Sequence, residues 1–83
     1  MKLGVVGIII EGDRSIARKV NDILSEYGEL IVGRMGLPNL YRDVCMISVG
    51  VKGSNEKISA LTGKLGRIAG VKVKSAVSDV DVE

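Results

Sequence analysis

Residues 3–28, LGVVGIIIEGDRSIARKVNDILSEYG, decide the fold, because they join a strand pattern to a helix pattern through a short polar turn. The first eight residues are apolar and rich in β-branched side chains, which predicts a buried strand at the centre of a sheet. From Ser15 to Tyr27, apolar residues recur at the three- and four-residue spacing of an amphipathic helix. Asp13 or Ser15 can cap this helix, and Gly28 stands where it should end.

The middle of the chain predicts two further strands. Residues 29–38 alternate loosely and indicate a strand that ends near Met35, ahead of Pro38 and a loop of sequence LPNLYRD. Residues 44–52, VCMISVGVK, form a second apolar run and predict the third strand.

A second helix and a last strand complete the pattern. Ser54 or Asn55 can cap the helix, whose apolar positions follow helical spacing at Ile58, Leu61, Leu65 and Ile68. Residues 70–77, GVKVKSAV, place Val and Ser on one face and Lys and Ala on the other. This alternation is typical of a half-exposed strand at the edge of a sheet.

The order of elements is therefore strand, helix, strand, strand, helix, strand. Two right-handed crossovers that interleave give an α+β fold, the ferredoxin-like βαββαβ sandwich. Its four-stranded antiparallel sheet has the spatial order 4-1-3-2, with both helices on one face. This order puts the two most apolar strands in the centre. We expect residues 1–83 to form one such domain.

The aliphatic content predicts a homo-oligomer, either a dimer or a tetramer. Hydrophobic residues make up 46% of the chain, yet it has no Phe and no Trp. The helices can cover one face of the sheet, whereas the first and third strands are apolar on both faces. We expect the uncovered face to be buried against another subunit, with Ile8, Ile9 or Ile47 on it. The sequence leaves open which of these three points outward.

Composition argues against several classes of function. A net charge of +2 and the scarcity of aromatic residues do not favour direct nucleic-acid binding. The apolar start is too short for a membrane span and has no cleavage site, and the one cysteine indicates a cytoplasmic protein. The chain has no histidine, and Cys45 is interpreted as a small core residue. We therefore expect no metal, no cofactor and no catalysis.

The stretch LTGKLGRIAGVKV, residues 61–73, looks at first like a phosphate-binding loop. Such a loop needs a glycine at position 58, which is Ile58, and a hydroxyl residue after Lys64. We interpret it instead as a helix that runs into a strand. Gly63 and Gly66 then predict close packing against the sheet or another subunit, and Gly70 predicts a left-handed residue that ends the helix.

The same stretch, together with the first helix and the R-x-G-x-P sequence that begins at Arg34, resembles a small family called the iron-only hydrogenase system regulators. The resemblance covers nearly the whole chain. It implies an ACT-like fold, similar to amino-acid-sensing ACT domains and to the C-terminal domain of the nickel regulator. It also implies a regulatory protein whose oligomer senses a small-molecule effector, such as an amino acid, at a subunit interface. A hydrogenase-maturation or regulatory protein would be its partner. The alternative is a structural or interaction module that acts through a protein partner without a ligand.

Two segments are candidate ligand sites. The turn formed by Glu11, Gly12, Asp13 and Arg14 corresponds to the turn that holds the effector in ACT domains, although the usual Pro-Gly pair is absent. Its charges beside free helix N–H groups suit a zwitterion, and the alternative is a plain capped turn. Arg34, where the second strand ends, could bind an anion or a partner. The alternative there is an exposed or paired arginine.

Overall fold

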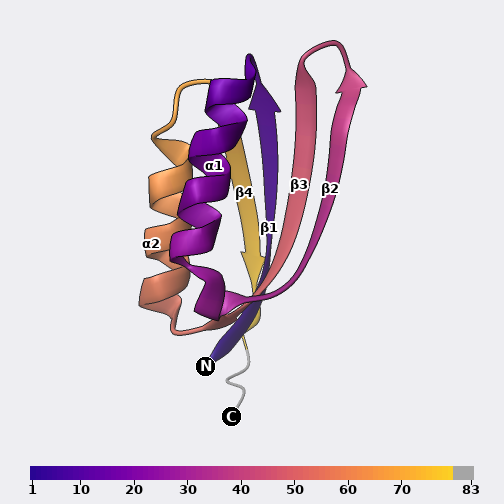
Figure 1. Cartoon of the computed structure of the whole chain (residues 1–83). Coiled ribbons are helices and arrows are strands. Elements are labelled where there is room, and N and C mark those ends of the chain that lie inside the picture. The colour runs from indigo at the N-terminus through magenta and orange to yellow at the C-terminus, as the bar shows by residue number, and fades with distance from the viewer. Residues whose placement is uncertain (80–83) are drawn as a thin grey trace.

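The computed structural model describes residues 1–79, apart from the side chains of residues 39 and 40. Its elements follow one another in the order shown in Figure 1: β1 (Lys2–Glu11), α1 (Arg14–Glu26), a 3-10 turn (Gly28–Leu30), β2 (Ile31–Tyr41), β3 (Val44–Gly53), α2 (Asn55–Gly66) and β4 (Val71–Val77).

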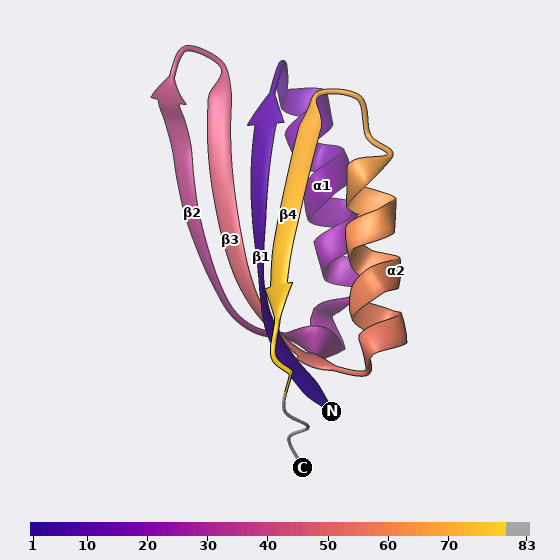
Figure 2. The same cartoon turned by 180° about the vertical axis from the view of Figure 1, so that it is seen from behind.

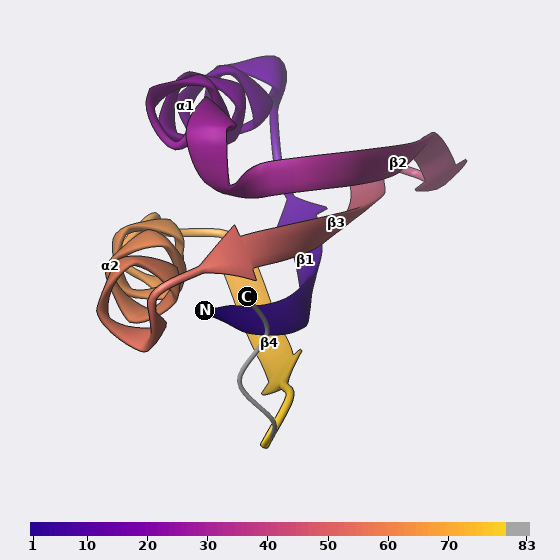
Figure 3. The ribbon, with the colours of Figure 1, turned by 90° about the horizontal axis from the view of Figure 1, so that it is seen from below.

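The four strands form one antiparallel sheet in the order β2-β3-β1-β4. Both helices lie on the same face of this sheet, as the views in Figures 2 and 3 show. The predicted ferredoxin-like α+β fold and its 4-1-3-2 strand order are therefore confirmed. The face beneath the helices is called the inner face below, and the opposite one the outer face.

The core lies between the helices and the inner face. Alternation along β1 sends Val6, Ile8 and Ile10 inward, where each is almost fully buried. They pack with apolar side chains of both helices and of β3, namely Val20, Leu24, Ile47, Val49, Val51, Ile58, Leu61 and Leu65. Burying an aliphatic side chain of this size stabilises a fold by roughly 1.5–3 kcal/mol. The helices are consequently held by packing on the sheet.

The register decides which isoleucine reaches the outer face. Ile9 pairs with Met46 and is 36% exposed there. Ile8 and Ile47 pair with each other one residue along and are buried beneath the helices. Neighbouring residues along a strand point to opposite faces of the sheet. Ile8 and Ile47 are thus corrected from candidate interface residues to core residues.

β2 is longer than the sequence predicts. It continues through Pro38 to Tyr41, so residues 37–41, which the sequence assigns to a loop, are strand, and only residues 42 and 43 form a turn. A proline fits here because β2 is an edge strand with β3 as its neighbour. The pairing is irregular between Leu37 and Tyr41, and the hairpin then turns at Arg42, which has a φ of 53°.

Lys64, the lysine of the glycine-rich stretch, joins the two helices. Its Nζ lies 2.8 Å from Oε1 of Glu26 on α1 and 5.2 Å from the centre of the Tyr27 ring. The hydrogen bond to Glu26 raises the pKa of Lys64 above its usual value. The lysine therefore has a role in the fold that needs no phosphate.

The glycines of this stretch differ from expectation. A Cβ on Gly63 or Gly66 would meet no atom within 4 Å outside its own helix backbone, so the predicted close packing against the sheet is wrong. The helix also ends at Gly66, ahead of the predicted end at Gly70. Gly70 does have a left-handed φ of 87°, and a Cβ there would lie 2.5 Å from the carbonyl oxygen of Glu11.

We therefore predict opposite effects for two substitutions by alanine. Gly63→Ala should raise the free energy of unfolding by about 1 kcal/mol, because alanine favours the helix and the added methyl meets open space. Gly70→Ala should lower it, because the methyl would collide with backbone at a left-handed position. Chemical denaturation measures both. A destabilised Gly63→Ala variant would show that another chain packs closely on α2.

Candidate functional site

Two adjoining hollows form a groove on the inner face, between α1 and the part of the β2–β3 hairpin that α1 leaves uncovered. Their volumes are about 310 and 260 Å³. Both are lined by Ile10, Ala17 and Cys45, which form a shared apolar floor. Several of the residues that line the groove are small, namely Ala17 and Cys45 on its floor and Gly36 on its rim. A Cβ on Gly36, at the β2 rim, would meet no atom within 4 Å. We call it the α1–hairpin groove.

The turn between β1 and α1 forms one end of the groove, through Gly12, Asp13 and Arg14. Gly12 has a φ of 136°, and its N–H donates to the carbonyl oxygen of Asp43 at 3.3 Å, which joins this turn to the tip of the hairpin. Asp43 also lines this end. The end therefore combines two acidic residues with one arginine.

Asp13 is the N-cap of α1. Its carboxylate accepts hydrogen bonds from the hydroxyl of Ser15 and, at 2.9 Å, from the Ser15 backbone N–H. These bonds hold the pKa of Asp13 below its usual value of 3.8. The residue is exposed, so the ionised carboxylate both caps the helix and faces solvent.

Glu11 points away from the groove. Its carboxylate lies 3.4 Å from Nζ of Lys72 on β4, and the register places both residues at the far end of the outer face. Of the four turn residues that the sequence singles out, three line the groove and Glu11 does not.

Arg34 marks the other end of the groove. Its guanidinium donates to Oδ1 of Asn21 on α1, and both residues line the second hollow. Asn21 follows Asp13 by eight residues, which is about 12 Å along a helix axis. The two candidate segments thus share one groove, but their charged groups stand at opposite ends of it.

The sequence does not reveal the middle of the groove. Cys45 packs against the core as expected, yet it is half-buried and lines both hollows. Ala17, Asn21 and Gly36 line the groove because the helix and the hairpin diverge around them. The positions of these three residues in the sequence do not predict the groove, because it depends on how the hairpin lies relative to α1 (Figure 1). Within residues 1–79, no three His, Cys, Asp or Glu side chains gather where they could hold a metal ion.

Comparison with known proteins identifies the family. Residues 2–75 match the TM1266-like family, described as "Iron-only hydrogenase system regulator, putative". The solved structure of the uncharacterized protein TM1266 from Thermotoga maritima is 35% identical, with a TM-score of 0.87 over 93% of this chain and 98% of that one. The chain belongs to this family. The resemblance seen in the glycine-rich stretch is confirmed.

Other solved structures share the fold of this hydrogenase-system regulator family at low identity. An ACT domain protein from Streptococcus pneumoniae is 14% identical, with a TM-score of 0.62 over 92% of this chain and 89% of that one. The nitrogen regulatory PII-like protein CPII from Thiomonas intermedia K12, bound to ADP, AMP and bicarbonate, is 21% identical, with a TM-score of 0.60 over 96% and 93% of the two chains. At these identities, the likeness to both proteins concerns the fold alone.

No curated protein matches the chain. Neither described helix has the length and apolar composition that crossing a membrane requires.

The cap at the groove predicts a titration. Because the folded-state pKa of Asp13 is lowered, its carboxylate stabilises the fold above about pH 3.8, and this contribution is lost as the pH falls through the folded-state pKa. Ser15→Ala should move the pKa of Asp13 up towards 3.8, as measured by NMR of the side-chain carboxyl carbon. Ser25→Ala, a serine farther along α1, is the control and should leave the titration of Asp13 in place. If the pKa of Asp13 is the same in the Ser15→Ala variant as in the wild type, the Ser15 hydroxyl is not what lowers it.

Proposed function

We propose that the chain is a regulatory domain of the iron-only hydrogenase system and binds a small charged effector in the α1–hairpin groove. The observation that carries the proposal is that both candidate segments line one continuous groove across a shared apolar floor. The family description supports a regulatory role. The chain would act without catalysis, as part of an oligomer, and pass the signal to a regulatory or maturation protein.

The groove indicates the chemistry of the effector. Asp13 and Asp43 at one end suit an ammonium group, and Arg34 at the other suits a carboxylate or phosphate. The two ends lie about 12 Å apart, which is longer than the backbone of one amino acid. An elongated zwitterion, such as an amino acid with a distal acidic or basic group or a short peptide, would contact both ends. A simple α-amino acid would contact one end.

A second candidate function is an interaction module without a ligand. It is favoured by the exposed apolar side chains on the outer face, among them Val5 and Met35, which are 48% and 60% exposed. In this case the groove would be a surface feature, and regulation would depend on protein contacts alone.

A thermal-shift screen of amino acids, dipeptides and small anions tests the effector proposal. A ligand at ten times its Kd adds about 1.4 kcal/mol, which raises the Tm of a domain of this size by roughly 6–10 °C. The variant Asp13→Ser keeps a capping hydroxyl but removes the charge, and Arg34→Gln removes the cation. Each should reduce the shift for the true ligand. Arg18→Gln, on the exposed face of α1, is the matched control and should leave the shift unchanged.

Cys45 gives an independent measurement within the groove. A bound effector should slow the alkylation of its thiol, because the thiol lines both hollows. Gly36→Val should fill the rim and abolish both the thermal shift and the protection of Cys45. If no compound shifts the Tm, or if shifts persist in all three groove variants, the effector proposal fails and the interaction module is favoured.

A further inference from the structure

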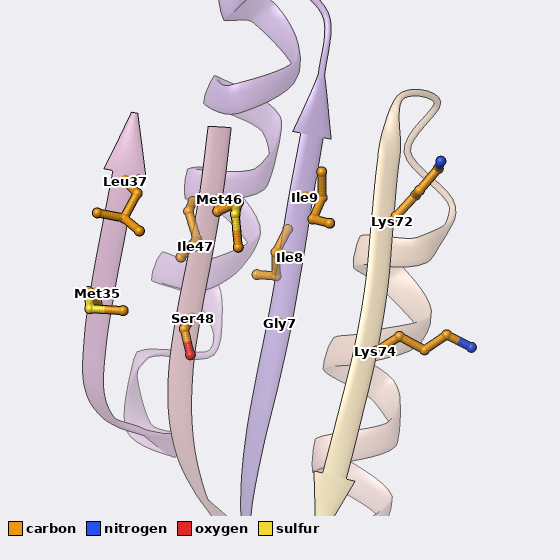
Figure 4. Close-up of a pocket in the computed structure, with 10 residues that line it drawn as sticks. All are labelled: Gly7, Ile8, Ile9, Met35, Leu37, Met46, Ile47, Ser48, Lys72 and Lys74. Atoms are coloured by element: carbon orange, nitrogen blue, oxygen red, sulfur yellow. The ribbon is translucent and has the colours of Figure 1, made fainter. Parts of the chain in front are cut away.

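The outer face carries a large apolar surface. Its exposed side chains come from three strands, namely Leu3, Val5, Ile9, Met35, Leu37 and Met46. Figure 4 shows several of them around a shallow hollow of about 300 Å³, with Lys72 and Lys74 along β4. The face measures about 19 by 34 Å from strand spacing and length, so two copies would bury about 1,300 Å², which lies in the range of stable interfaces.

The shape of this face follows from the register. Gly7 pairs with Ser48 on one side and with Lys74 on the other, which leaves a hollow in the middle of the sheet. A Cβ on Gly7 would have its nearest neighbour at 3.8 Å, so the hollow is open. Two residues away on the same strand and face, Val5 projects outward. A hollow and a projection are therefore adjacent on β1.

The same alternation occurs on β2, with the order reversed. Met35 projects from the outer face and is 60% exposed, whereas Gly33, two residues away, leaves an open space in which a Cβ would meet no atom within 4 Å. The inward-pointing residues between them, Arg34 and Val6, each pair with Val49 on β3. A line across the sheet through Arg34, Val49 and Val6 thus separates the projecting side chain from the hollow on both strands.

A two-fold axis along that line makes the face complementary to itself. The axis lies between two facing sheets and runs perpendicular to the strands. It places Val5 over Gly7 of the second copy and Met35 over Gly33 of the second copy, and each contact occurs twice. The sheets would pack about 10 Å apart with their strands antiparallel.

Charge supports the same axis. The axis crosses β4 at Ser75, which pairs with Val6, so Lys72 lies over Ser78 of the second copy and beside its Asp79. Ser78 and Asp79 are held next to the start of β1 by a bond from the Ser78 N–H to the Leu3 carbonyl oxygen at 2.7 Å. The ammonium group of Lys72 in each copy therefore lies near the carboxylate of Asp79 in the other.

The other simple two-fold axis, parallel to the strands, fits poorly. It would stack β4 on β2 and lay Lys72 over Leu37, and Gly7 would face Ser48. The hollow at Gly7 would then lie on that of the other copy, and Lys72 would lose the acidic neighbour that the first axis provides.

We infer that the outer face binds a second copy of this chain, with the strands antiparallel across the interface and Lys72 of each copy beside Asp79 of the other. The inference is independent of any effector, because the α1–hairpin groove lies on the inner face. A protein that binds no effector would leave this interface in place, whereas a monomeric protein would leave the groove in place but remove the oligomer from the proposed function.

Gly7→Val tests the shape of the interface by sedimentation velocity. Wild-type protein should sediment as a dimer at micromolar concentration. The variant should fold at least as stably, because valine favours strands and its Cβ meets open space, yet its dimer should be at least about tenfold weaker. Gly36→Val makes the same change on the inner face and should leave the dimer intact.

A charge reversal tests the orientation. Lys72→Glu and Asp79→Lys should each weaken the dimer by roughly fivefold, as expected for two exposed ion pairs, and the double variant should recover the loss. Lys72 also pairs with Glu11 in its own chain, so denaturation of each variant separates folding from assembly. Lys57→Glu on α2 is the control and should not change the dimer. A monomeric wild type, a Gly7→Val dimer of full affinity, or a double variant no tighter than the single ones would overturn the inference.

Discussion

The pairing of β1 with β3 is the constraint on which the rest of the structure depends. Ten residues of each strand run in unbroken antiparallel register, from Lys2 opposite Gly53 to Glu11 opposite Val44. Because the register has no bulge, every second residue faces the helices along the whole length. It therefore sets both the continuous core on the inner face and the cluster of exposed apolar side chains on the outer one. The turn after Glu11 and the hairpin tip before Val44 are brought to the same end of the sheet, where the groove begins.

The fold could be predicted because each element carries a strong local pattern. The apolar spacing from Ile16 to Tyr27 predicts a helix. The apolar runs at residues 3–10 and 44–52 predict strands at the centre of a sheet, where both of their faces are covered. The end of β2 could not be predicted, because Pro38 normally stops a strand and is tolerated here by its edge position. Likewise, two isoleucines next to each other look alike until the register assigns Ile8 to one face and Ile9 to the other.

The two ends of the candidate site could be predicted from the sequence, but its floor could not. Asp13 stands out because an acidic residue before a helical stripe is a capping signal, and Arg34 stands out as a charge in an apolar strand. What joins them is a floor of small side chains such as Ala17 and Cys45, which look like ordinary core residues. They are exposed because the β2–β3 hairpin diverges from α1 (Figure 1), which is a tertiary property. The GKLG stretch gave the opposite kind of error. Gly63 predicted a close contact that the chain does not make.

The irregular end of β2 also bears on edge-to-edge aggregation of the sheet. A long edge strand with exposed Val32, Met35 and Leu37 offers unpaired backbone groups that could template cross-β stacking into fibrils. Pro38 has no N–H to donate, and the pairing shift between Leu37 and Tyr41 bends the strand out of the regular spacing that such stacking needs. Pro38 and the irregular pairing near the hairpin tip therefore work against edge-to-edge stacking of β2.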